Sequence, residues 1–458
     1  MRINTNISAI IANNQLQSTE GKLSKSLERL SSGLRINRSA DDSAGMAIAS
    51  KMRTQIRGLD QSSRNASDGI SIVQTAEGAL NEVGSMLQRM RELSVQGASG
   101  TYTDEDRDAI QMEVDALRDE IERIAKDTEF NKKPLLDGTL DRRSYSNNVD
   151  VDITKVSDTV KAGTYAINVT TVAKQAVLPG GTMNNTNTLG ETVTGTVSIN
   201  GYSVEIKEGD SSGDVFHKIK VAGDKLGIDV TAVNSADVAV SFDDVDAQLK
   251  FTSNAYGTSA EITINCSDTA LATVLGIPMA GSTVNGTNAV ARFAKDLVTE
   301  ERIGFSNSAT MVSDGKEVTI TDKSGFSMTY EVDSDIEGTP PGLPIRVNAE
   351  VTDIGTLTVH IGANEGQVME IRIPEISLKR MGIDDLNLRT ADGCSKGISA
   401  LDEAISFIST TRASLGAYQN RLDSSVASLD ATGENMTAAL SRIEDVDMAE
   451  EMSTYTQL

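Results

Sequence analysis

Residues 66–97 read ASDGISIVQTAEGALNEVGSMLQRMRELSVQG, and this stretch decides the fold. Small or apolar residues recur in it at alternating spacings of three and four, and a second apolar row with a period of seven runs beside them. Such a double row predicts a long helix whose wide apolar stripe needs partner helices to cover it. The first row is Ala66, Gly69, Val73, Ala76, Leu80, Val83, Leu87, Met90, Ser94 and Gly97, and the second is Ile72, Ala79, Met86 and Leu93.

A matching apolar seam lies near the other end of the chain. Its members follow one another at a strict period of seven residues, which indicates left-handed coiled-coil packing. We therefore expect the two ends of the chain to pair, in a helical rod longer than an ordinary globular core helix. The members of this seam are Leu401, Ile408, Leu415, Leu422, Leu429, Met436 and Ile443.

The composition indicates a soluble, elongated protein with an aliphatic core. Among the 458 residues, 42 are Lys or Arg and 66 are Asp or Glu, and the resulting net charge of -24 argues against nucleic acid as a partner. Only 3% of the residues are aromatic, so burial depends on aliphatic side chains, as in a helical bundle. No apolar run is long enough to cross a bilayer, so we expect no membrane insertion, and the first residues lack the apolar core of a signal peptide.

The N-terminal part is expected to form successive helices. A narrow seam of Leu23, Leu27, Leu30 and Leu34 is interrupted at Gly33, which suits a helix C-terminus, and Asp41 or Asp42 is expected to cap the helix that follows. Residues 3–14 are rich in Asn and Ser, so we expect them to be disordered in the free chain and helical only when packed. A further helix is expected to open at Thr103, with acidic residues in its first turn.

The middle of the chain changes to β character. From about Tyr145, Thr and Val alternate with other residues at period two, and Asn200-Gly201 between two such runs predicts a hairpin. A short helix is expected over 212–226, and the β-rich block forms either one domain or two small ones that split near Gly286. Together the patterns predict an α+β protein: a long coiled-coil-like helical rod built from both termini, with an inserted β-rich outer domain.

The sequence contains no recognisable catalytic or metal-binding cluster. The two histidines, His217 and His360, lack a neighbouring nucleophile or second ligand, and the two cysteines belong to no C-x-x-C pair. The acidic run at 243–246 lacks the glycine and the distal glutamate of a calcium loop. We therefore expect neither an enzyme nor a bound metal or cofactor.

The apolar seams at the two ends exceed what a narrow bundle of one chain needs. Each fully buried Leu, Ile or Met contributes roughly 1.5–3 kcal/mol, so further copies of the chain are expected to cover the outermost turns. Contacts between copies that do not close build a helical filament, whereas contacts that close build a finite coiled-coil oligomer, and both remain open here. The residues expected to carry self-assembly are Leu23, Leu27, Leu30, Leu34, Leu429, Met436 and Ile443.

Six stretches at the two ends closely resemble bacterial flagellin. They are MRINTN at 1–6, LSSGLRIN at 30–37, DDSAGMAI at 41–48, QRMREL at 88–93, SLGAYQNRL at 414–422 and SRIEDVD at 441–447. The resemblance covers residues 1–140 and 355–458. Between them, the chain is similar to the family only in carrying a variable insertion that faces outward.

The resemblance implies a division of the chain into five segments. These are a filament-core helix over 1–42, the first part of a helical shell over 43–145, a β-rich outer insertion over 146–352, a hairpin and return helix over 353–430, and a second core helix over 431–458. The second core helix ends earlier than is usual in the family, so we expect it to be incomplete.

The resemblance also implies partners and a location. A flagellin leaves the cell through the flagellar export apparatus with a chaperone, and it polymerises with its own copies into the extracellular filament that serves motility. The family's epitope for Toll-like receptor 5 matches here at Arg89, Leu93 and Glu113, with Gln88 and Gln96 on the same patch. The alternatives are a flagellar hook-filament junction protein, which shares the terminal helices, and a flagellin-like adhesin that binds through its insertion.

Overall fold

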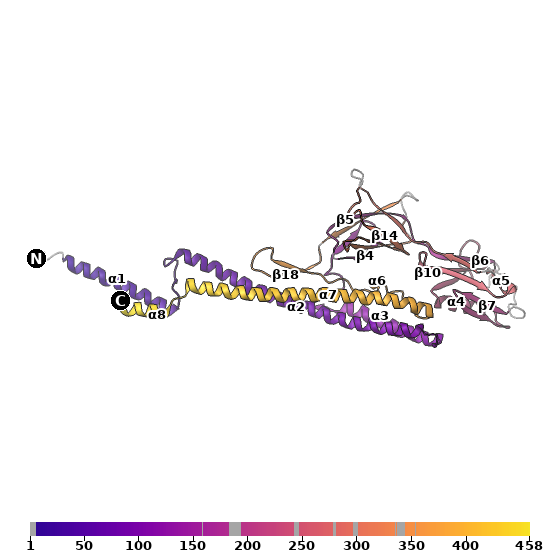
Figure 1. Cartoon of the computed structure of the whole chain (residues 1–458), viewed down its shortest axis with the longest axis horizontal. Helices are drawn as coiled ribbons and strands as arrows, with labels where there is room; N and C mark the ends of the chain where they lie inside the picture. Colours follow the sequence, from indigo (N-terminus) through magenta and orange to yellow (C-terminus); the bar gives the residue numbers. More distant parts are fainter. Residues whose placement is uncertain are drawn as a thin grey trace. The chain divides into compact units, whose positions relative to one another are not determined.

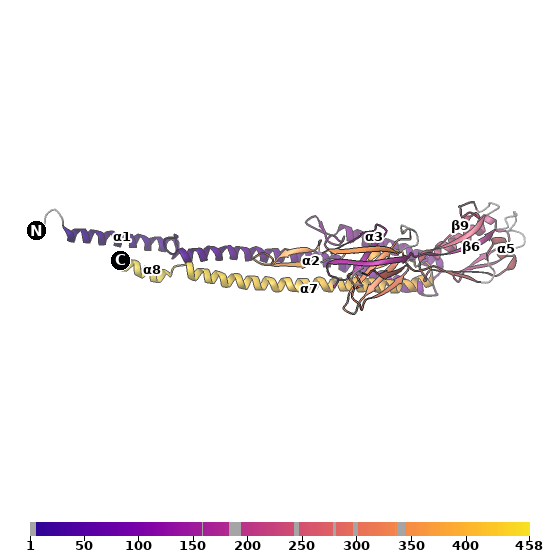
Figure 2. The same ribbon diagram turned by 90° about the horizontal axis from the view of Figure 1, so that it is seen from above.

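The computed structural model describes residues 6–157, 159–182, 194–241, 247–277, 281–295, 301–334, 336, 344–352 and 354–458 (Figures 1 and 2). Each of its two compact units contains a part of α2 (Ser43–Ala98) and a part of α7 (Ala391–Glu444). Unit 1 comprises Met1–Glu77, Leu357–Ile371 and Ala413–Leu458, and unit 2 comprises Gly78–Thr356 and Arg372–Arg412.

In unit 1, helix α1 (Ile7–Ser32) lies beside α8 (Met448–Gln457), as both views show (Figures 1 and 2). The Asn6 side chain caps the start of α1 by accepting a hydrogen bond of 3.2 Å from a backbone N–H of the first turn. The expectation that residues 3–14 are disordered in the free chain and helical only when packed is wrong for Ile7–Asn14, which belong to α1 in the single chain, and its part on residues 3–5 lies outside the described residues. Lengthening a helix that already exists needs no new nucleus, because each added residue contributes a hydrogen bond.

The turn after α1 joins the two ends of the chain. Helix α1 ends at Gly33, whose φ of 75° lies in the left-handed region that favours glycine. The Gly33 carbonyl accepts a hydrogen bond of 3.0 Å from the N–H of Val446, and the N–H of Arg35 donates one of 2.7 Å to the carbonyl of Glu444. Asp42 then caps α2 by accepting a 2.9 Å hydrogen bond from the backbone N–H three residues on. The predicted helix end and acidic cap are both confirmed.

Small residues let other elements approach α2 closely in unit 1. A Cβ atom at Gly69 would lie 3.2 Å from Val359 and 3.4 Å from Leu422 of α7. Val359 belongs to an antiparallel hairpin of β18 (Leu357–His360) and β19 (Val368–Ile371). The predicted pairing of the two chain ends is therefore confirmed. The residues of the α7 seam that are buried in this unit are Leu415, Leu422 and Leu429.

In unit 2, the later part of α2 packs with α3 (Asp104–Asp127) and the first part of α7. A Cβ atom at Gly97 of α2 would lie 2.6 Å from the Cys394 Sγ of α7 and 3.6 Å from Ile110 of α3. The three helices therefore meet where α2 has no side chain. Thr103 caps α3 in a capping box with Asp106, which confirms the predicted start of this helix. Short strands β1 (Glu129–Phe130) and β2 (Lys133–Pro134) follow it.

The β-rich part of unit 2 surrounds two hydrophobic clusters. The flanking cluster draws on residues 151–173 and 289–351, and the nested cluster draws on the residues between them, 176–284. Two antiparallel sheets enclose the flanking cluster. Their strand orders are β13 (Val290–Phe293), β5 (Gly163–Thr171), β17 (Ile345–Thr352), β3 (Arg143–Ser146), and β14 (Thr310–Asp314), β15 (Glu317–Thr321), β16 (Ser327–Val332), β4 (Val151–Val156).

Two further antiparallel sheets and two helices, α4 (Ser212–Lys225) and α5 (Thr269–Leu275), enclose the nested cluster. The strand orders are β6 (Gln175–Thr182), β10 (Gln248–Tyr256), β9 (Ile228–Val233), and β12 (Ser282–Asn285), β11 (Glu261–Cys266), β7 (Gly195–Ile199), β8 (Tyr202–Ile206). Asn200 and Gly201 have φ angles of 47° and 84°, as the predicted tight turn between β7 and β8 requires.

The predicted α+β class, with long terminal helices and an inserted β-rich part, is confirmed. None of the helices within the described ranges is long and apolar enough to cross a membrane.

Removing the Leu422 side chain tests the packing of α7 on α2 in unit 1. Leu422 is fully buried, so Leu422→Ala is expected to lower the free energy of unfolding by about 2–5 kcal/mol, the usual cost of a cavity of this size. Leu16→Ala is the matched control, because Leu16 is 66% exposed and its loss should change stability little. Urea unfolding followed by circular dichroism measures both, and equal losses in the two variants would contradict this packing.

Candidate functional site

The first turns of α1 form an exposed, partly apolar surface. Every side chain from Asn6 to Ser18 is exposed, and four of them are large and apolar. The exposed fractions are 60% for Ile7, 51% for Ile10, 63% for Ile11 and 66% for Leu16. We call these four residues the α1 surface. None of the four is among the self-assembly residues predicted from the sequence, although the spacing of Ile7, Ile10 and Ile11 is typical of one helix face.

The self-assembly residues predicted on α1 lie partly against α8. Ser26 is buried, and Leu23 and Leu30 share its side of the helix at spacings of three and four residues, where both are half-buried. An ion pair of 3.6 Å between Arg29 and Glu451 links the same part of α1 to α8. Leu27, by contrast, is 50% exposed. The structure therefore divides the predicted seam between an internal contact and the surface.

The self-assembly residues predicted on α7 form a gradient of burial. Leu429 is buried, whereas Met436 and Ile443 further along the helix are half-buried. In the following helix α8, Met448 and Met452 are about half exposed, at 48% and 51%. Leu34, at the turn after α1, is half-buried and forms an isolated bridge with Asp445. Unit 1 thus leaves apolar surface open on both terminal helices, as a subunit contact would require.

Polar contacts fix the turn from which α1 leaves. The carboxylate of Asp41 forms an ion pair of 2.6 Å with Lys25. It also accepts hydrogen bonds of 3.0 and 3.2 Å from the backbone N–H groups of Arg38 and Asn37. The hydrogen bond from Lys25, followed by those from the backbone, lowers the pKa of Asp41 to about 2 from its usual 3.8. Arg53 forms a further ion pair with Glu444, between the start of α2 and the end of α7.

A second candidate surface lies on α2 and α3 within unit 2. The guanidinium Nε of Arg89 donates a 2.9 Å hydrogen bond to the carboxylate of Glu113, so these two predicted receptor-binding residues meet across the two helices. Gln88 and Gln96 are also exposed on α2. Leu93 is only 2% exposed, so it packs beneath this surface and offers a partner almost no area. We call the exposed residues Gln88, Arg89, Gln96 and Glu113 the α2–α3 patch.

Glu92 contacts the α2–α3 patch through Arg89, although it is not among the receptor-binding residues predicted from the sequence. Its carboxylate lies 3.4 Å from Arg89, three residues earlier on the same helix. That spacing brings side chains onto one helix face and could have identified the pair from the sequence.

The side chains with reactive groups are dispersed. In the described part of the chain, no group of three or more His, Cys, Asp or Glu side chains is placed to hold a metal ion. His217 and His360 are exposed on separate elements, and Cys266 and Cys394 are buried as free thiols. The acidic run at 243–246 lies outside the described residues.

Comparison with known proteins identifies the family to which this chain belongs. Residues 3–141 match the model of the bacterial flagellin N-terminal helical region, and residues 398–458 match that of the C-terminal helical region. The flagellin of Clostridium tyrobutyricum is 33% identical over 457 residues, which cover 100% of this chain and 95% of the relative. The flagellin of Salmonella muenchen is 30% identical over 502 residues, covering 99% of this chain and 94% of the relative.

Among solved structures, FliC from Burkholderia pseudomallei overlaps 77% of this chain and 99% of its own, with 17% identity and a TM-score of 0.24. The sequence matches define a protein with flagellin-type helical regions at both ends. This chain belongs to the bacterial flagellin family, which confirms the resemblance in the sequence.

The Asp41 contacts give a pH-dependent contribution to the stability of unit 1. Because the folded-state pKa of about 2 lies below the usual 3.8, the contribution is fully present above about pH 4 and is lost as the pH falls through about 2. Asp41→Asn should therefore unfold at lower urea concentration than the wild type at about pH 6, and the difference should shrink toward about pH 2. Other titrating groups cancel in this comparison.

Asp229→Asn serves as the control, since Asp229 is exposed on β9. Its difference from the wild type should stay small at every pH. A constant difference between wild type and Asp41→Asn across the acid range would show that the carboxylate charge contributes nothing.

Proposed function

We propose that this chain is a structural subunit of the bacterial flagellar filament, which polymerises through its terminal helices and serves motility outside the cell. The observation that carries the proposal is the α1 surface, whose large apolar side chains lie in water in the single chain. Fully burying an Ile or Leu is worth roughly 1.5–3 kcal/mol, so covering these half-exposed residues would contribute on the order of 5 kcal/mol. Membership of the flagellin family supports other copies of the chain as the cover.

The proposal assigns a role to each segment of the chain. Residues 1–42 and 431–458 form the filament core, 43–145 and 353–430 form the surrounding shell, and 146–352 form the outer insertion. The two hydrophobic clusters support the last assignment, because they give the insertion a core of its own. Export through the flagellar apparatus, with a chaperone, belongs to the same proposal and rests on family membership.

Replacing an apolar residue of the α1 surface by a charged one tests filament formation. Leu16→Glu should raise the concentration needed for salt-induced polymerisation by roughly tenfold or more, because a charge would have to be buried in the contact between copies. Glu favours helix, so α1 itself should persist. Electron microscopy and sedimentation measure the filaments.

Val312→Glu is the matched control, since Val312 is 63% exposed on strand β14 in the insertion. It should polymerise as the wild type does. Equal impairment of both variants would remove the α1 surface from the assembly contact. Failure of the wild type to form filaments would favour the junction protein or the adhesin instead.

We also propose that the α2–α3 patch is a ligand surface for Toll-like receptor 5. The ion pair between Arg89 and Glu113 supports this, because it holds two of the resembling residues together at about half exposure, 48% and 46%. Leu93 contributes indirectly, by packing beneath the patch and holding α2 in place. The patch belongs to the shell segment, where filament assembly would compete with the receptor for access.

A pair of arginines on α2 allows a matched test of this surface. Arg89→Ala should lower receptor activation in reporter cells by roughly tenfold or more, as for a central interface arginine. Arg91→Ala is the control, because Arg91 forms its ion pair with Asp402 of α7 and lies outside the patch. Equal loss in both variants would indicate a general effect on the helices, and full activity of Arg89→Ala would contradict the proposed contact.

A further inference from the structure

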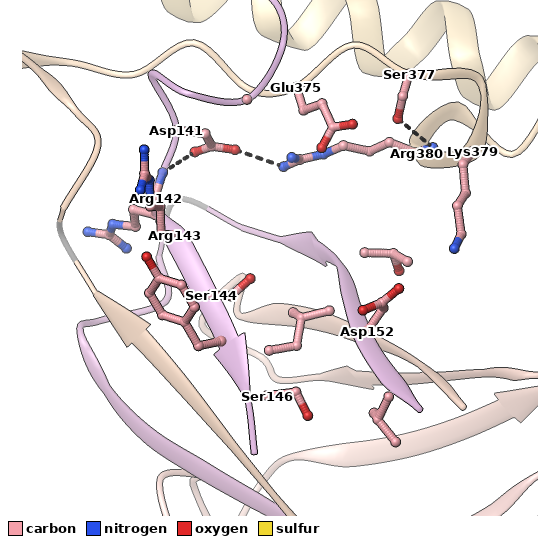
Figure 3. Close-up of a pocket in the computed structure, with 15 residues that line it drawn as sticks. Asp141, Arg142, Arg143, Ser144, Ser146, Asp152, Glu375, Ser377, Lys379 and Arg380 are labelled. Carbon is pink, nitrogen blue, oxygen red and sulfur yellow. Dashed lines mark hydrogen bonds and ion pairs between the residues drawn. The ribbon is translucent and has the colours of Figure 1, made fainter. Parts of the chain in front are cut away.

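A half-open polar pocket of about 400 Å³ lies in unit 2 where the chain enters the β-rich insertion (Figure 3). One wall consists of β3 and β4, and the facing wall is the segment from Glu375 to Arg380, which includes the single turn α6 (Leu378–Met381). The filament-subunit proposal assigns nothing to this pocket. Its volume lies within the range of pockets that hold small molecules.

Ion pairs hold the walls of the pocket in place. Arg380 lies 3.1 Å from the carboxylate of Asp141, and both side chains are mostly buried, at 13% and 17% exposed. The same carboxylate accepts a 2.8 Å hydrogen bond from the N–H of Arg142. Lys379, the neighbour of Arg380, forms a 2.8 Å ion pair with Glu331 of β16. Two adjacent cations thus join α6 to the segment before β3 and to β16, which holds this wall of the pocket in place before a ligand binds.

Other polar groups of the lining remain available to a ligand. In the described part of the chain, the carboxylates of Asp152 and Glu375 accept no hydrogen bond, and the side chain of Arg143 makes no ion pair. The hydrogen bond to Glu331 raises the pKa of Lys379, and the charge of Asp152 across the pocket adds to this effect. Ser144 and the half-exposed ring of Tyr145 also line the pocket. Figure 3 shows Arg143 and Asp152 at opposite ends of the hollow. Among the described residues, the buried Nε of Arg380 has no hydrogen-bond partner.

This set of groups matches a sugar that carries a carboxylate. Carboxylate and hydroxyl side chains exchange hydrogen bonds with the hydroxyl groups of a sugar ring, and an aromatic side chain covers its apolar face. A guanidinium is the side chain best suited to a ligand carboxylate. A simple anion such as phosphate fits less well, because it offers few hydroxyl groups that could donate hydrogen bonds to Asp152 and Glu375. We propose that this pocket binds an acidic monosaccharide unit of the uronic acid class, with Arg143 at its carboxylate and Asp152 and Glu375 at its hydroxyls.

The test is titration of the full-length monomeric chain with D-glucuronate, by calorimetry and ligand-observed NMR. D-glucose, which has the hydroxyls but lacks the carboxylate, and glutarate, which has carboxylates but no ring, are titrated beside it. Glucuronate should bind saturably, and roughly tenfold or more tightly than glucose or glutarate. The reason is that only glucuronate engages both Arg143 with its carboxylate and Asp152 and Glu375 with its hydroxyls. Monomer is used, so the outcome is independent of filament formation.

Two variants locate the binding, and a third is the control. Arg143→Gln and Asp152→Asn should each weaken glucuronate binding by roughly tenfold or more, because each removes a charge-assisted contact. Arg292→Gln, at an exposed arginine of β13 outside the pocket, should bind as the wild type does. The proposal is overturned if the wild type shows no saturable binding of glucuronate, or if Arg292→Gln weakens binding as much as the pocket variants do. It is also overturned if glucose binds as tightly as glucuronate.

Uronic acids occur both in host glycosaminoglycans and in bacterial polysaccharides, and the site chemistry is shared by the two. Fragments of hyaluronan and of alginate therefore form a second arm of the titration. Saturable binding of either polymer that is lost in Arg143→Gln supports the site, and the tighter of the two identifies the source. If Arg143→Gln still binds both polymers as tightly as the wild type does, the proposed site is overturned.

Discussion

The contact between α2 and α7 is the constraint on which the rest of the structure depends, because each unit is built around a part of it. Glycines of α2 face α7 in both units: Gly69 lies beside Leu422 in unit 1, and Gly84 lies beside Ile408 in unit 2. Bare backbone at these positions allows the helices to approach closely. Rising residue numbers on α2 meet falling numbers on α7, as an antiparallel pair requires. The α2 helix therefore buries a large part of its stripe against residues from the far end of the chain.

A pairing between opposite chain ends leaves the middle of the chain free to vary. The entropy of closing a flexible loop grows slowly with length, by about 0.6 kcal/mol for each doubling, so an insertion between the paired helices costs them little. The insertion also buries its own apolar residues, such as Phe251 in the nested cluster and Tyr330 in the flanking cluster. The nested cluster is in turn an insertion within the flanking part, because it lies in the chain between β5 and β13, and these two strands still pair with each other.

The sequence predicted what local periodicity and turn chemistry determine. The seam through Leu422, the hairpin at Asn200-Gly201 and the cap at Thr103 each depend on residues close together in the chain, and each is confirmed. The sheet order could not be predicted, since β5 pairs with β17 from beyond the nested cluster and no short-range pattern specifies that partner. The contact between Arg89 and Glu113 likewise depends on how α3 folds back on α2, whereas the apolar row containing Leu93 already indicated burial.

The charge of the chain reconciles an exposed apolar surface with solubility. A net charge of -24 makes copies of the chain repel one another, and salt screens this repulsion beyond a Debye length of about 8 Å at physiological ionic strength. Residues 6–18, however, contain no charged side chain at all. Burying the segment that exposes the α1 surface therefore removes water from no charged side chain. Charges elsewhere in the sequence keep the single chain in solution. Because the apolar segment and the charged residues lie in different parts of the sequence, association depends on ionic strength while the apolar contact itself is not weakened.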